Sequence, residues 1–98
     1  MNKTNHIKLV FDKATTRLAY YPYGKEVYEQ QVKPNIDFSN DITYIEFPDQ
    51  IVKAASSFVQ GFFEDIISNI GYEAIEKKIV ILSKNESLKS SIKTNLIF

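Results

Sequence analysis

Side chains that could carry out chemistry are few in this sequence and lie far apart. His6 is the single imidazole and there is no cysteine, so a serine–histidine–aspartate relay and a zinc site both lack their usual groups. The carboxylates show no spacing typical of a cation site, and the adjacent Glu64 and Asp65 fit a solvated helix face. The three glycines are widely separated, which leaves no glycine-rich phosphate loop. We therefore expect no enzymatic activity, no metal and no cofactor.

Two adjacent serines, Ser56 and Ser57, open the strongest helical pattern of the chain. A serine at the start of a helix ordinarily accepts a backbone N–H and caps the helix. The same position also suits a phosphate, because the helix dipole and the unpaired N–H groups favour negative charge there. A phosphoserine carries a charge of about −1.5 to −2 and could repel an acidic partner. Both interpretations, a structural cap and a modification site, remain open at the level of sequence.

Tyrosines gather on either side of Pro22, at Tyr20, Tyr21, Tyr23 and Tyr28. One interpretation is a contact surface, since tyrosine is enriched in protein interfaces. The other is that part of the cluster completes the core, with the hydroxyl groups reaching the surface. The sequence favours neither strongly enough to discard the other.

The charge balance and the apolar runs narrow the classes of partner. Lys and Arg number 12 and Asp and Glu also number 12, which gives a formal net charge of zero. A nonspecific nucleic-acid binder or an anionic-membrane binder needs an excess of cations, so neither is favoured. No apolar run approaches the ~20 residues of a membrane span, and the polar stretch from Met1 to His6 lacks a signal-peptide pattern. Together with the absence of cysteine, these features favour a cytoplasmic protein.

The elements that must position these residues follow from hydrophobic patterning. Of 98 residues, 44% are hydrophobic, which fits one domain over residues 1–98 with a flexible segment at 1–6. The patterns predict strands over 7–11, 42–47 and 79–82 and helices over 55–70 and from about 85 to 96. They also predict a short helix after Thr15 or Thr16 that stops at Pro22, and helical turns within 24–32.

The helix over 55–70 has the clearest pattern. Its apolar residues recur at intervals of three and four, as expected for one buried stripe; they are Ala55, Phe58, Val59, Phe62, Phe63, Ile66, Ile67 and Ile70. Gly61 within the helix indicates close packing against a neighbouring backbone, and Gly71 stands where a left-handed C-cap residue is expected.

The remaining segments complete an alternation of strands and helices. Residues 73–78 are interpreted as a polar connection, and the apolar run 79–82 as a strand covered on both faces. Asn85 or Ser87 is expected to cap the last helix. The alternation predicts a layered α/β domain with right-handed crossovers.

Several short motifs point to a known family; they are Thr16-Arg17, Ile45-Glu46-Phe47-Pro48, Ile51, Ala55-Ser56-Ser57-Phe58 and Gly61-Phe62-Phe63. Through these motifs the sequence resembles the STAS-like family of unknown function, which is related to the STAS domains of anti-anti-sigma factors. The resemblance spans roughly residues 7 to 96.

The resemblance implies a small α/β domain with a mixed sheet packed by about three helices. It also implies a binding module without enzymatic activity, whose partner is a GHKL-type kinase that phosphorylates a serine at the position of Ser57. The phosphorylated motif of such domains is close to Asp-Ser-Ser-Gly, and here Ala55 and Phe58 replace its first and last residues. The fold therefore carries over better than the phosphorylation switch.

The leading hypothesis is a non-enzymatic regulatory domain, of bacterial or mobile-element origin, that binds a protein through the N-terminal end of the 55–70 helix. The residues expected to contact that partner are Thr16, Arg17, Tyr20, Tyr21, Tyr23, Lys53 and Phe58, with Ser57 and Ser56 as the switch positions. Two alternatives are a phage- or plasmid-encoded inhibitor of a host defence or regulatory complex and a nucleotide-binding module. A homodimer also remains open, since edge strands can pair.

Overall fold

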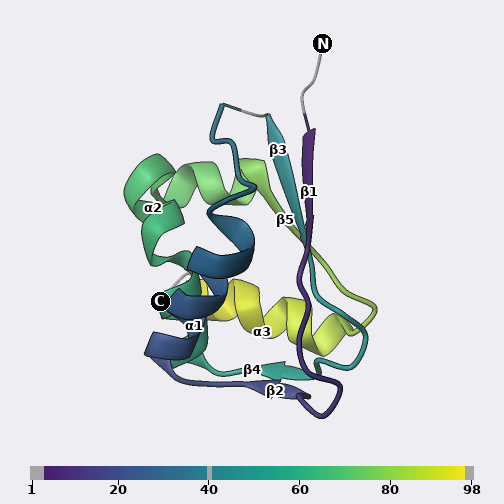
Figure 1. Ribbon diagram of the computed structural model, residues 1–98. Coiled ribbons are helices and arrows are strands. Elements are labelled where there is room, and N and C mark those ends of the chain that lie inside the picture. The colour runs from purple at the N-terminus through teal and green to yellow at the C-terminus, as the bar shows by residue number, and fades with distance from the viewer. Residues whose placement is uncertain (1–3, 40, 97–98) are drawn as a thin grey trace.

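Two small parallel β-sheets and a layer of helices make up the computed structural model, which describes residues 4–39 and 41–96 (Figure 1). The elements in chain order are β1 (Thr4–Lys8), β2 (Arg17–Leu18), α1 (Tyr21–Val27), the π-helical η1 (Tyr28–Val32), β3 (Ile42–Glu46), β4 (Lys53–Ala54), α2 (Ser56–Lys78), β5 (Ile79–Leu82) and α3 (Glu86–Leu96). The predicted α/β class with helices packed on a sheet is confirmed.

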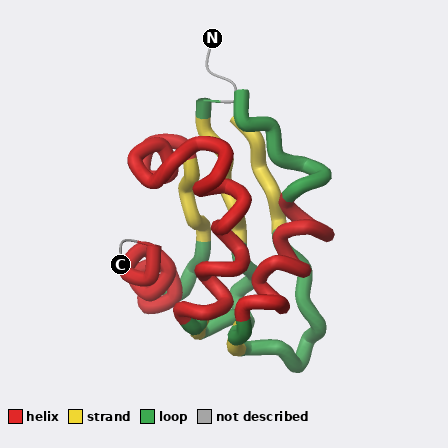
Figure 2. Tube along the Cα trace, turned by 90° about the vertical axis from the view of Figure 1, so that its left-hand side faces the viewer, coloured by secondary structure: helices red, strands yellow, loops and turns green. Residues whose placement is uncertain are grey.

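The larger sheet has the strand order β1-β3-β5, and both of its strand pairings are parallel. The β2–β4 pairing is parallel too, so the mixed pairing expected from the resemblance is not seen among the described strands. Each step along the sheet goes in the same direction, so two right-handed crossovers bring their helices to one face. Figure 2 shows the helices gathered on one side of the strands.

The core lies between this inner face and the helices. Ile7, Ile45 and Ile81 are register partners across all three strands, and all three side chains are buried. Phe62 and Ile66 of α2 are fully buried within the same cluster. The predicted stripe of α2 is therefore the face that packs against the sheet.

The outer face of the sheet carries the alternate residues. His6, Tyr44 and Val80 form one row of register partners, and none of them is buried. The prediction that 79–82 is covered on both faces is therefore wrong, because Ile81 alone in that strand is buried. Both crossovers lie on one side, which leaves the other face of this parallel sheet without helices.

α1 and α2 cross at very short range through two glycines. A Cβ atom at Gly24 would lie 2.2 Å from the carbonyl oxygen of Phe58, and one at Gly61 would lie 2.2 Å from the carbonyl oxygen of Tyr21. Each helix therefore needs a residue without a side chain where the other backbone passes. The close packing predicted for Gly61 is confirmed.

The segment before α1 differs from the prediction. No helix occupies 14–20; the chain forms β2 instead, and Pro22 lies in the first turn of α1 rather than ending a helix. Proline suits a first helical turn, where its missing N–H group would have no partner. The helical turns expected within 24–32 are confirmed as parts of α1 and η1.

Two further boundaries differ. Residues 4–6, expected to belong to a flexible segment, lie in β1, while 1–3 are outside the described residues. Residues 73–78, expected to be a connection, are helical and bury Ile75. Gly71 (φ 81°, ψ 164°) has the predicted positive φ, but the helix resumes after it.

Asn85 caps α3 as predicted, since its Oδ1 accepts the N–H of Leu88 at 3.0 Å.

Candidate docking surface at the start of α2

The two-residue strands β2 and β4 bring two basic side chains side by side. Arg17 pairs with Lys53 and Leu18 with Ala54 in the parallel register. Leu18 and Ala54 are buried, whereas Arg17 and Lys53 are exposed. The alternation of a strand therefore buries one pair and presents the other pair to solvent.

Backbone hydrogen bonds hold this ladder against the start of α2. The N–H of Val52 donates to the carbonyl of Thr16, and that of Ala55 donates to the carbonyl of Leu18, both at 2.8 Å. The Thr16-Arg17 pair, distant in sequence from Ser56, is thereby fixed next to the first turn of α2.

Ser57 has a different role from the cap that its position suggested. Its Oγ accepts the backbone N–H of Tyr20 at 3.1 Å, while Ala55 is the N-cap residue of α2 and makes no side-chain cap hydrogen bond. Ser57 therefore joins the start of α2 to the start of α1. Its hydroxyl satisfies a backbone donor outside its own helix.

Tyr20 has an unusual backbone at this junction. Its φ of 77° is the positive value that residues with a side chain rarely adopt, and its side chain is 75% exposed. Such conformations cost of order 1–3 kcal/mol and persist where the surroundings enforce them. The hydrogen bond to Ser57 is part of that enforcement, and the turn directs a large aromatic ring outward.

Ser56 is the first residue of α2 and is exposed, whereas Ser57 is partly exposed. The first turn of α2 contains no acidic residue. A phosphate on Ser56 would therefore meet the positive end of the helix dipole without a competing carboxylate. A phosphate on Ser57 would stand beside the N–H of Tyr20.

Phe58 does not belong to the exposed surface. It is 1% exposed and stacks on Phe62 with ring centres 5.7 Å apart. The prediction that Phe58 contacts a partner is therefore wrong, because the helical repeat places it on the same inward stripe as Phe62 and Ile66. Tyr23 is partly buried and packs against Phe58, with ring centres 5.7 Å apart. Burial raises the pKa of the Tyr23 hydroxyl.

The tyrosine cluster divides between the two roles that the sequence left open. Tyr28 is buried, and its hydroxyl donates to Asp65 Oδ2 at 2.5 Å. Burial, followed by that hydrogen bond, raises the pKa of Tyr28. Tyr21 remains exposed and donates to the Glu64 carboxylate, which is the main reason that its pKa is raised.

Sequence reasoning missed the ladder that joins these residues. Strands of two residues give no periodicity, so β2 and β4 were not predicted. The only indication of these strands in the sequence was that the apolar Leu18 and Ala54 each follow a basic residue. The structure brings together Thr16, Arg17, Tyr20, Lys53, Ser56 and Ser57, which we call the docking surface, whereas the Tyr21 hydroxyl lies at Glu64, further along α2.

Within residues 4–39 and 41–96, no group of three or more His, Cys, Asp or Glu side chains could hold a metal ion. Over the same residues, no helix is long and apolar enough to cross a membrane. No family model, curated protein or solved structure matches the chain.

Proposed function

We propose that this chain is a non-enzymatic interaction domain of STAS-like type that binds a protein partner through the docking surface. The observation that carries the proposal is the β2–β4 ladder, which places Arg17 and Lys53 beside the serines that open α2. Thr16-Arg17 and Ala55-Ser56-Ser57-Phe58, two of the motifs that carry the resemblance, lie next to each other in the structure, and this supports the proposal.

The docking surface suits an acidic partner. In the described part of the chain, neither Arg17 nor Lys53 has a carboxylate within salt-bridge distance, although both side chains are exposed. Adjacent cations without internal partners favour an anionic surface, which speeds association and sets orientation. Tyr20 adds an exposed aromatic ring of the kind enriched in interfaces.

Regulation by phosphorylation would follow from the same charges. A phosphate on Ser57, or on the more exposed Ser56, would add about −1.5 to −2 charge next to the ladder. It would offset the positive charge of Arg17 and Lys53 and repel an acidic partner. The kinase class that the resemblance suggests is the GHKL type, which would then be the partner itself or its neighbour.

Co-purification from the source cell, followed by mass spectrometry, tests the docking surface. Wild type should retain a stoichiometric protein partner, and Arg17→Glu and Lys53→Glu should each lose it. Lys33→Glu is the matched control, because Lys33 is an exposed lysine after η1, away from the ladder. Retention of the partner by both ladder variants, or its loss from the control as well, would reject this surface.

The modification is tested separately once the partner is known. Intact-mass analysis after incubation with the kinase and ATP should show one added phosphate, which should disappear in Ser57→Ala or in Ser56→Ala. Absence of any mass shift in wild type would remove phosphorylation from the proposal and leave the docking surface unaffected.

A further inference from the structure

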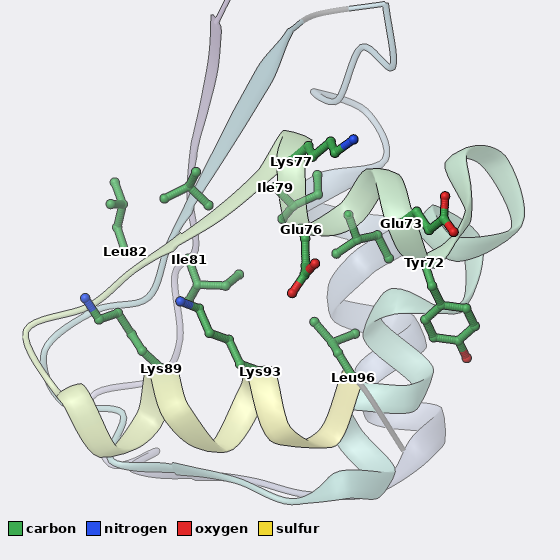
Figure 3. A pocket seen from close by; sticks show the side chains of 12 residues that line it. Tyr72, Glu73, Glu76, Lys77, Ile79, Ile81, Leu82, Lys89, Lys93 and Leu96 are labelled. Carbon is green, nitrogen blue, oxygen red and sulfur yellow. The ribbon is translucent and has the colours of Figure 1, made fainter.

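A second surface lies at the β5 edge of the three-stranded sheet, where an open groove of about 830 Å³ runs beside β5 (Figure 3). β5, α3 and the last part of α2 line it. Ile75, Ile79, Ile81 and Leu96 contribute apolar side chains to its walls. The groove shares no residue with the docking surface.

β5 is an edge strand without the usual protection of an edge. It hydrogen-bonds to β3 on one side, and among the described residues no strand pairs with its other side. The opposite edge strand, β1, carries His6 and Lys8, polar residues that discourage pairing. β5 reads Ile-Val-Ile-Leu, an apolar edge that is suited to accept another strand.

The charges of the groove are separated along its length. Lys89 and Lys93 of α3 lie toward Leu82, whereas Glu73, Glu76 and Lys77 of α2 lie toward Ile79 and Leu96, so negative charge is in excess at that end (Figure 3). Lys89 has Glu86 at 3.2 Å on its own helix. Within the described chain, no salt bridge is formed by Lys93, Glu73 or Glu76.

This separation selects the orientation of an added strand. A parallel copy of β5 would bring lysines to lysines and glutamates to glutamates. An antiparallel copy, related by a two-fold axis perpendicular to the sheet, reverses the groove and places the acidic end of one copy against the basic end of the other. The groove is thus complementary to itself under the commonest symmetry of protein dimers.

We propose that β5 pairs with β5 of a second copy of this chain, forming a symmetric dimer with one continuous six-stranded sheet. The pairing is antiparallel and centred on Val80. That register places Ile79 opposite the partner's Ile81 on the inner face, because residues directly opposite each other share a face. A centre on Ile81 would instead place Ile79 opposite Ser83.

Charge reversal and mixing test the two-fold arrangement directly. Analytical ultracentrifugation should show wild type as a dimer, with Glu76→Lys and Lys93→Glu each weakened roughly tenfold, since two related pairs become repulsive at once. An equimolar mixture of the two variants should recover wild-type affinity as a heterodimer, because both contacts between copies are then attractive. Ser87→Lys, an exposed residue of α3 outside the groove lining, is the control and should dimerise as wild type does.

A monomeric wild type over the micromolar range would overturn the proposal, even if the groove binds a peptide. A mixture of variants that stays monomeric would also overturn it.

The absence of cysteine permits a test of register. Val80→Cys should form a disulfide-linked dimer under mild oxidation, because residues opposite each other in an antiparallel pair have Cα atoms about 4.5–5.5 Å apart. Val10→Cys, 71% exposed and outside the groove, is the control and should not cross-link. Equal cross-linking of both would reject the pairing. These variants leave the docking surface unchanged, so the proposed dimer and the proposed function can each be rejected without affecting the other.

Discussion

The α1–α2 interface and the β5–α3 groove are built in opposite ways. At the first, two backbones meet at Gly24 and Gly61, and aromatic rings fill the space beneath. At the second, helix and strand stand apart, and Ile79 and Leu96 remain partly exposed. One region is closed by contacts within the chain, whereas the other has apolar groups that its own fold does not cover.

This difference indicates where stability and where association arise. Close packing contributes through many short contacts and tolerates no added atoms. A half-covered apolar edge contributes less to folding. Its exposed apolar surface can still be buried against a partner, which favours association. Substitutions in the first region should therefore change the unfolding free energy, and those in the second should mainly change the oligomeric state.

Phe62→Ala should have the largest effect on stability. Phe62 is fully buried and contacts the rings of Tyr28, Phe47, Phe58 and Phe63. Its loss should cost about 3–5 kcal/mol through the cavity that it leaves. Leu96→Ala, in the groove, should cost about 1 kcal/mol. Urea denaturation of both measures the contrast, and equal losses would show that the two regions are packed alike.

Gly61→Ala should have the next largest effect on the free energy of unfolding. The sign of that effect tests whether α1 and α2 cross closely at this residue. In an ordinary helix interior this change stabilises by about 1 kcal/mol. Here the new Cβ would meet the Tyr21 carbonyl at 2.2 Å, so the helices must move apart at a cost of about 1–3 kcal/mol. A thermal melt compares it with Ser90→Ala on the exposed face of α3. A raised melting temperature for Gly61→Ala would contradict the close crossing.

Tyr28→Phe should give a smaller loss, of about 1 kcal/mol at neutral pH, from the hydrogen bond to Asp65. Because burial raises the pKa of Tyr28 in the folded protein, the folded state holds the phenolic proton to higher pH than the unfolded chain does. That part of the stability is complete below pH about 10, the ordinary pKa of tyrosine, and is lost as the pH rises above it.

The alkaline decline in unfolding free energy should therefore be shallower in Tyr28→Phe than in wild type. Tyr21 and Tyr23, whose pKa values are also raised, should keep part of the decline. Denaturation curves between neutral pH and the alkaline range measure this slope. Tyr20→Phe, at an exposed residue, is the control, and an unchanged slope in Tyr28→Phe would contradict the assignment.

Arg17→Glu and Lys53→Glu should have the smallest effect on stability, within about 0.5 kcal/mol of wild type, because both side chains are exposed. Chemical denaturation of each variant checks this directly. A large loss would mean that the ladder is structural, and any loss of partner binding would then need another explanation.

The sequence by itself determined the elements with long or distinct patterns. The stripe from Phe58 to Ile66, the strand at Ile42–Glu46 and the cap at Asn85 follow from local periodicity and local hydrogen bonding. It also determined that Gly61 needs a close neighbour, because a helix keeps a costly glycine for a reason. These features depend on residues near one another in the chain.

Only the tertiary structure decided which surfaces are open. Ser57 looked like a cap and bonds Tyr20 instead, and β5 looked covered and is an edge. Each depends on contacts between distant segments: the β2–β4 ladder, the α1–α2 crossing and the side to which both crossovers turn. Local patterns cannot specify such contacts, because the same periodic stripe or apolar strand can be covered in more than one way.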